Sequence, residues 1–185
     1  KFLKAQINPH FLFNSINTVF HLIDQDAELS KSLLAKFSDV LRYHLYQSAD
    51  ELVPLNTEIA HVQNYIEMEK IRRGDLLEVR VDVGDNIGYL EIAPLILLTF
   101  VENAFKHVST QLEGQNWIKI KVNRVEQQLK IIVENTRNQL AESQPPNGHG
   151  GIGLANGDRH ELEFSNDWDT FKVQLNLEVN ELHHH

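Results

Sequence analysis

The chain has 185 residues, about one domain and a small addition, and 42% of them are apolar, which is enough for a buried core. Its 17 basic and 26 acidic residues leave a net charge of −9, which argues against a general binder of nucleic-acid phosphates. The absence of cysteine excludes disulfides, thiolate metal sites and a cysteine nucleophile. The longest apolar run, residues 92–101, is too short to span a bilayer.

Both ends of the sequence look cut. The chain starts without a methionine and inside a helical pattern, so we expect a fragment whose upstream part, including any membrane segment, lies outside this sequence. The last three residues, 183–185, are histidines, which could form a metal-binding tract. We interpret them instead as the remnant of an expression tag and leave them out of the functional interpretation.

Two amphipathic helices are predicted at the start of the chain. Apolar residues recur at helical spacing over residues 1–24 and again over residues 29–47. Pro9 either kinks the first helix or restarts it as its first residue. Because the link at residues 24–26 is short, the helices should form an antiparallel hairpin. So much apolar surface requires a partner, most simply a second copy of the chain, so we expect a homodimer.

The rest of the chain mixes helices and strands, and Pro54 marks its beginning. The predicted elements are a helix over residues 56–72 that ends at Gly74, a strand over 77–83, a helix from Pro94 to residue 108, strands over 118–122 and 129–133, a polar loop over 136–150, and a hairpin of strands over 162–164 and 171–179. Segregated helices and hairpins indicate the α+β class, with helices on one face of a mixed, mostly antiparallel sheet.

A histidine directly after a proline is the first candidate for chemistry. His10 follows Pro9 and is flanked by aromatic and amide side chains. If Pro9 restarts the helix, His10 lies in its first turn, where the positive end of the helix dipole disfavours imidazolium. A neutral imidazole can act as a nucleophile. The alternative is a histidine that only packs between helices.

The predicted fourth helix carries a second candidate. Asn103, Lys106 and His107 follow the i, i+3, i+4 spacing and therefore share one face. An amide oxygen can hold Mg²⁺, and a lysine and a histidine can hold phosphate oxygens. The alternative is a solvated polar face with an ion pair between Glu102 and Lys106.

The third candidate is the glycine-rich run over residues 148–154. Glycines allow backbone N–H groups to approach phosphates closely. The run matches neither the GxGxxG pattern nor the Walker A loop. The alternative is a flexible turn.

Together and in this order, the three segments resemble one family, the LytS/YehU-like sensor histidine kinases of bacterial two-component systems. The resemblance runs from Leu3 to Val179. It rests on Gln6–Asn14, on Val101–Ala104 with Lys106 and His107, which is similar to the N box, on Gly151–Leu154, which is similar to the second glycine box, and on Leu41–Tyr43, Tyr65–Glu67 and Arg72.

The resemblance implies a dimerising, phosphoacceptor hairpin over residues 1–53 and a GHKL-type (Bergerat) ATP-binding domain, a two-layer α/β sandwich, over residues 54–180. His10 would accept the γ-phosphate of Mg-ATP and pass it to an aspartate of a response regulator. The fragment would be the cytoplasmic part of a membrane sensor. The implied nucleotide site comprises Asn103 for Mg²⁺, with Glu102 as a further candidate ligand, Lys106 and His107 at the phosphates, Asn135 at adenine, and Gly151 and Gly153 in the lid.

The first glycine box departs from the family pattern, which usually reads Asp-x-Gly-x-Gly. Asn135 stands at the aspartate position, and Arg137 and Gln139 replace the glycines. An asparagine oxygen can still accept a hydrogen bond from the adenine amino group, but a neutral acceptor should bind it more weakly than a carboxylate.

The sequence departs from the family at two further places. Gly157 follows Asn156 directly where the family continues with an amphipathic helix, so we expect part of the inner face of the sheet to be uncovered. Either a stretch of the natural chain is absent from this sequence at that point, or the chain carries a true deletion. No carboxylate follows His10 to act as a base. Thr99 stands where related ATPases carry a water-activating glutamate, which suits a kinase.

Three functions remain open at this stage. The first is a homodimeric histidine kinase that autophosphorylates on His10. The second is a degenerate kinase that acts as a dimeric signalling scaffold with weak or no ATP binding, and the altered first glycine box favours it. The third, a GHKL ATPase of the clamp type, leaves His10 unexplained and lacks a carboxylate at Thr99.

Overall fold

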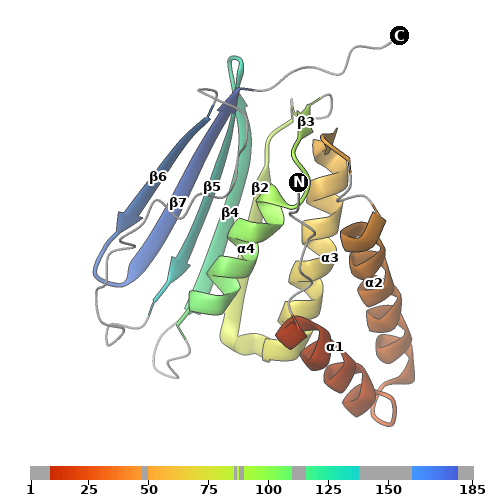
Figure 1. Ribbon diagram of the computed structural model, residues 1–185. Coiled ribbons are helices and arrows are strands. Elements are labelled where there is room, and N and C mark those ends of the chain that lie inside the picture. The colour runs from red at the N-terminus through yellow and green to blue at the C-terminus, as the bar shows by residue number, and fades with distance from the viewer. Residues whose placement is uncertain are drawn as a thin grey trace.

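The computed structural model describes residues 9–46, 50–85, 87, 90–109, 116–137 and 160–178. Its elements are α1 (Pro9–Leu22), α2 (Ala27–Tyr46), β1 (Val53–Pro54), α3 (Leu55–Arg73), the 3₁₀ helix η2 (Gly74–Leu76), β2 (Leu77–Val83), β3 (Glu91–Ile92), α4 (Ile96–His107), β4 (Asn116–Val125), β5 (Gln128–Thr136), β6 (His160–Asn166) and β7 (Thr170–Glu178). Helices α3 and α4 lie against one face of a five-stranded sheet, and α1 and α2 pack on the far side of α3 (Figure 1). This arrangement confirms the predicted α+β class.

Helices α1 and α2 form the predicted hairpin. α1 begins at Pro9, whose fixed φ suits the first residue of a helix. α2 begins two residues earlier than predicted because an Asp26 carboxylate oxygen accepts the Leu29 N–H at 2.9 Å and caps the helix. The Ser30 hydroxyl donates to the Val19 carbonyl at 3.2 Å and ties the two helices together near their link.

Helices α3 and α4 follow the predicted pattern with one difference at a helix start. α3 begins directly after Pro54 and ends at Gly74, which has a φ of 66° that glycine adopts easily. α4 begins at Ile96 and not at Pro94, because Leu95 takes a left-handed conformation with a φ of 66°. The buried face of α4 then lies against β5 and α3.

The sheet has the strand order β2-β4-β5-β7-β6. β2 runs parallel to β4, and every other neighbouring pair is antiparallel, as the mixed, mostly antiparallel prediction requires. The predicted strands at residues 118–122 and 129–133 are both longer in the structure, because pairing along β4 and β5 continues up to a tight turn. Two-residue strands β1 and β3, which the sequence did not predict, pair with each other.

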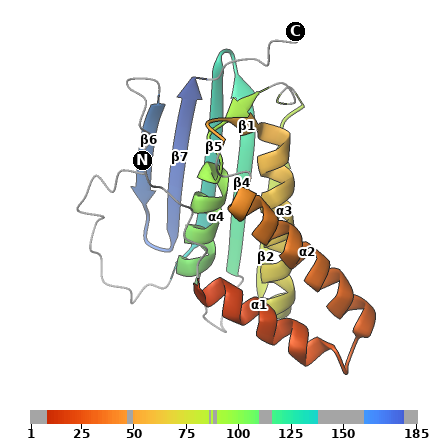
Figure 2. The same cartoon turned by 45° about the vertical axis from the view of Figure 1, so that its right-hand side comes forward.

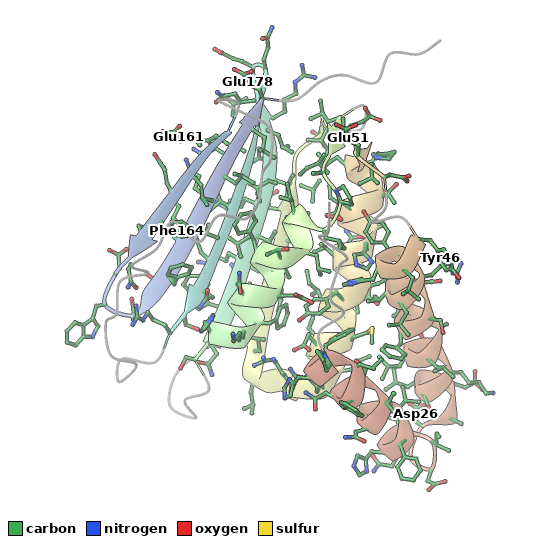
Figure 3. All side chains as sticks on the ribbon, viewed as in Figure 1. Asp26, Tyr46, Glu51, Glu161, Phe164 and Glu178 are labelled. Atoms are coloured by element: carbon green, nitrogen blue, oxygen red, sulfur yellow. The ribbon has the colours of Figure 1, made fainter. Side chains whose placement is uncertain are left out.

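The inner face of the sheet is incompletely covered at its β6 edge. Leu162 and Phe164 lie opposite the buried residues Leu175 and Val173 of β7, so they are on the core face of the sheet. Phe164 is nevertheless 50% exposed (Figure 3). This exposure agrees with the expectation of an uncovered patch where the family continues with a helix after Asn156, although residues 138–159 themselves lie outside the described residues.

No helix among the described residues is both long and apolar enough to cross a membrane.

Candidate functional site

His10 lies in the first turn of α1, directly after Pro9, and its imidazole is exposed. The side-chain amide of Asn14, one turn later, lies 3.1 Å from the ring nitrogens and donates to the ring. A neutral imidazole at an exposed helix start is competent to act as a nucleophile.

The residue next to His10 anchors this helix start. The ring of Phe11 is buried, 6.3 Å from that of Phe37 on α2 and 5.0 Å from that of Tyr65 on α3, centroid to centroid. Tyr65 in turn meets Phe105 of α4 edge-on at 5.6 Å. Aromatic pairs at such separations each add about 0.5–1.5 kcal/mol beyond the burial of their area. A chain of rings therefore connects the start of α1 with α4.

The polar face predicted for the fourth helix is present on α4. Asn103, Lys106 and His107 are all exposed and lie in its last two turns. Partial loss of solvent, and then the charge of Lys106, lower the pKa of His107. The neutral form of His107 is therefore favoured, and Lys106 is the cation of this face.

Glu102 has different surroundings from the three exposed residues of α4. It is half-buried, and burial followed by the nearby Glu69 carboxylate raises its pKa. Glu69 itself is buried on α3 and accepts hydrogen bonds from Arg72 at 2.5 Å and Arg73 at 3.1 Å. Arg73 also donates to the Phe105 carbonyl at 2.5 Å. These contacts attach the middle of α4 to the end of α3.

Asn135 supplies a buried polar group near the end of β5. It is 1% exposed, and its amide nitrogen donates to the Thr136 carbonyl at 2.9 Å. Its side-chain oxygen has no hydrogen-bond partner among the described residues. A buried acceptor without a donor costs about 1–3 kcal/mol, so this oxygen is a site where a ligand donor would be favoured.

The start of α1, the end of α4 and the end of β5 lie at the same end of the molecule (Figure 1). The Ser109 N–H donates to the Thr136 carbonyl at 2.9 Å, which holds the residues after α4 against the end of β5. The first turn of α1 lies at this end as well, as two views show (Figures 1 and 2). The structure thus gathers the regions of His10, Asn103 and Asn135 without placing them in one described pocket.

Part of the predicted site cannot be compared with the structure. Gly151 and Gly153, and the whole run over residues 148–154, lie outside the described residues. Among the residues that are described, no group of three or more histidine, aspartate or glutamate side chains could hold a metal ion. A Mg²⁺ ion held by Asn103 would therefore take most of its other ligands from phosphates and water, which is common for this ion.

A buried polar cluster around Glu58 was missed by the sequence analysis. The Glu58 carboxylate on α3 accepts hydrogen bonds from the Tyr43 hydroxyl of α2 at 2.8 Å and from the Leu95 N–H at 2.7 Å. The ring of Tyr43 stacks on His61 at 4.1 Å. The one available signal was spacing, because Glu58, four residues before Val62, falls on the buried face of the predicted helix.

The comparisons with known proteins agree on the family. The model of the histidine kinase family matches residues 1–77. The sensor protein LytS of Oceanobacillus iheyensis is 32% identical over 131 residues, which are 71% of this chain and 22% of LytS. The sensor histidine kinase BtsS of Escherichia coli K12 is 32% identical over 169 residues, which are 91% of this chain and 29% of BtsS.

Among solved structures, one described as a bacterial phosphotransferase matches with a TM-score of 0.50 and 7% identity, covering 90% of this chain and 88% of that one, which concerns the fold alone. The chain spans less than a third of the length of the two curated relatives. The two alignments nevertheless include 71% and 91% of this chain. The chain is similar to the LytS and BtsS sensor proteins over most of its length, and its first 77 residues match the histidine kinase family.

Proposed function

We propose that this chain is the cytoplasmic kinase portion of a two-component sensor, and that it transfers the γ-phosphoryl group of ATP to His10. The observation that carries the proposal is the exposed imidazole of His10 in the first turn of α1, within hydrogen-bond distance of the Asn14 side chain. A nitrogen of His10 forms the new bond to phosphorus while the bond to the ADP oxygen breaks. The phosphoryl group then passes to an aspartate of a response regulator.

The proposed nucleotide site comprises the exposed face of α4 and the end of β5. Asn135 accepts a hydrogen bond from the adenine amino group, because its buried oxygen lacks a protein donor. Lys106 contacts the phosphates, with His107 beside it. Asn103 holds Mg²⁺, which when bound neutralises phosphate charge during the transfer. Gly151 and Gly153 are assigned to the lid from the resemblance only.

We assign residues 1–53 to a dimerising hairpin and residues 54–180 to an ATP-binding domain of the GHKL type. Exposed large apolar side chains along one side of α1 and at the residue after it support dimerisation, namely Phe13, Ile16, Phe20 and Ile23. Their spacing of three and four residues makes a continuous stripe. A second copy of the chain is the simplest partner that would bury it.

Incubation with γ-labelled ATP and Mg²⁺ tests the kinase function. We expect label that is labile in acid and stable in alkali, as a phosphorylated imidazole would be, and we expect His10→Gln to abolish it. His21→Gln is the matched control, since His21 is an exposed histidine on the same helix. Label that persists in His10→Gln, or none in a folded and dimeric sample, would contradict the proposal.

The surroundings of Arg137 favour a second candidate, a scaffold that no longer binds ATP well. Arg137 stands where the family has a glycine, and its guanidinium donates to the Asn166 side chain in β6. The backbone N–H of Arg137 also donates to the Asp169 carbonyl, at 2.8 Å. A large side chain tied to the end of β6 stands where the family has a glycine. A titration with Mg-ATP distinguishes the two functions, because a scaffold would bind only at millimolar concentrations or not at all.

A further inference from the structure

The carboxylate of Glu58 is the meeting point of three separate elements. Glu58 lies in the first turn of α3 and is fully buried, with 0% of its surface exposed. One of its oxygens accepts both the Tyr43 hydroxyl of α2 and the Leu95 N–H that precedes α4. The other oxygen of this carboxylate is buried and has no hydrogen-bond partner among the described residues. A single side chain of α3 thus contacts α2 and the start of α4, and α3 lies between these two helices (Figure 1).

The start of α4 depends on this carboxylate because it has no cap of its own. Leu95 occupies the N-cap position with a φ of 66°, and no side-chain cap is formed there. For a non-glycine residue the left-handed conformation costs about 1–2 kcal/mol. The Leu95 carbonyl accepts the Thr99 N–H at 2.9 Å, so this strained residue also begins the hydrogen bonding of α4. Glu58 satisfies the Leu95 amide at the N-cap position and so supports the helix start from outside.

Tyr43 connects the same carboxylate to the hairpin that carries His10. Its side chain is buried, and its ring lies flat on His61 of α3 with an interplanar angle of 20°. The hydroxyl therefore has little freedom to turn away from Glu58. A shift of α2 along α3 would lengthen this hydrogen bond and change the support of the first turn of α4.

α4 carries such a change to the proposed nucleotide site. The helix has 12 residues, so it is about 18 Å long, and Asn103 and Lys106 lie in its second half. A helix this short moves as a rigid rod, so a tilt at Leu95 displaces the polar face at the other end.

We propose that Glu58 is a positioning residue for α4, and that its hydrogen bond to Tyr43 makes the position of α4 depend on the helical hairpin. The proposal rests on the proposed nucleotide site, since it assigns to Glu58 and Tyr43 a role in how that site is held. It assigns neither residue a contact with the nucleotide.

The main test compares Tyr43→Phe with Tyr46→Phe. Phenylalanine keeps the ring on His61 and removes the hydroxyl, whereas Tyr46 is exposed at the end of α2 (Figure 3). We expect Tyr43→Phe to speed hydrogen exchange at the Leu95 amide at least fivefold and to weaken Mg-ADP binding three- to tenfold. Tyr46→Phe should change neither quantity. Unchanged exchange at the Leu95 amide in Tyr43→Phe would overturn the proposal.

A pair of substitutions at Glu58 separates positioning from simple stability. Glu58→Gln keeps an oxygen that can accept both donors, whereas Glu58→Leu removes it. We expect Glu58→Gln to bind Mg-ADP within threefold of the unchanged chain and Glu58→Leu to lose at least tenfold. Equal losses in the two variants would overturn the proposal. If the chain without substitutions fails to bind Mg-ADP, the proposed function is contradicted. The hydrogen-exchange comparison of Tyr43→Phe with Tyr46→Phe needs no nucleotide, so it still tests the role of Glu58 and Tyr43.

Discussion

Asn135 is a residue whose burial opposes stability unless a ligand contributes. Its side-chain oxygen is buried without a donor, and its neighbours on the same face of β5, Val133 and Ile131, are apolar core residues. A purely structural residue at this position would be apolar, because an unsatisfied buried acceptor costs about 1–3 kcal/mol. The cost is explained if the oxygen accepts the adenine amino group.

Asn135→Val should therefore move stability and binding in opposite directions. We expect the free energy of unfolding without nucleotide to rise by about 1 kcal/mol, since the unpaired acceptor is gone and the Thr136 carbonyl keeps its bond from Ser109. Affinity for Mg-ATP should fall at least about tenfold. Urea unfolding and a nucleotide titration measure the two effects. Asn176→Val on β7 is the control, and a loss of stability without loss of binding would contradict this role.

His61 gives the fold a sensitivity to acid. Burial, and then the nearby His44, lower the pKa of His61 to about 3, whereas an unfolded histidine titrates near 6.5. Because the folded-state pKa is lowered, the unfolded chain binds the proton more readily. The contribution of His61 is present above pH 6.5 and is lost as the pH falls towards 3. The buried Glu58 and Tyr43 face the same cluster, and burial raises the pKa of Glu58, which partly offsets this loss in acid.

We expect the free energy of unfolding to fall between pH 7 and pH 5 by about 2 kcal/mol more in the unchanged chain than in His61→Phe. Phenylalanine keeps an aromatic ring against Tyr43 but cannot take up a proton. Urea midpoints at the two pH values give the difference. His21→Phe on the exposed side of α1 should keep the original slope, and identical slopes for His61→Phe and the unchanged chain would refute the assignment.

At the scale of elements, periodicity was sufficient to predict the helices and the long strands but not all of their ends. α4 begins at Ile96 because Leu95 adopts a positive φ, which leucine rarely does and which no sequence pattern indicates. β1 and β3 have two residues each, too few for an alternating pattern to be visible. These features depend on tertiary contacts, such as the hydrogen bond between Glu58 and Leu95, that join distant parts of the chain.

The candidate site also contains residues that the sequence indicated and one residue that only the fold shows. His10, Asn103 and Asn135 could be named from the sequence because their residue types and flanking motifs are local. The burial of Asn135 was also implicit in the alternation along its strand. The role of Glu58 could not be predicted from the sequence, because a glutamate in a predicted helix is normally assigned to the solvent face. Only the fold shows that its carboxylate meets Tyr43 and the start of α4.

Among the described residues, the start of the helical hairpin presents an apolar surface that no other element covers. The α1 stripe, formed by Phe13, Ile16, Phe20 and Ile23, is exposed, with Phe20 at 72%. α1 contains no aspartate, glutamate, lysine or arginine, so burying this helix would remove no such charge from water. The net charge of −9 would oppose the approach of two copies, but salt screens it beyond about 8 Å at physiological ionic strength. Apolar burial should therefore decide the association.

Replacing two residues of the α1 stripe should convert a dimer into a monomer. Ile16→Glu with Phe20→Glu removes four apolar side chains from a symmetric interface, which would cost about 6–12 kcal/mol at about 1.5–3 kcal/mol for each buried side chain. Both positions are about half or more exposed within one copy, so the monomer should still fold. Phe164→Glu, at the uncovered edge of the sheet, is the control and should leave the dimer intact. Sedimentation equilibrium at micromolar concentration measures the mass, and an unchanged chain that is monomeric, or a double variant that stays dimeric, would show that the stripe is not the dimer interface.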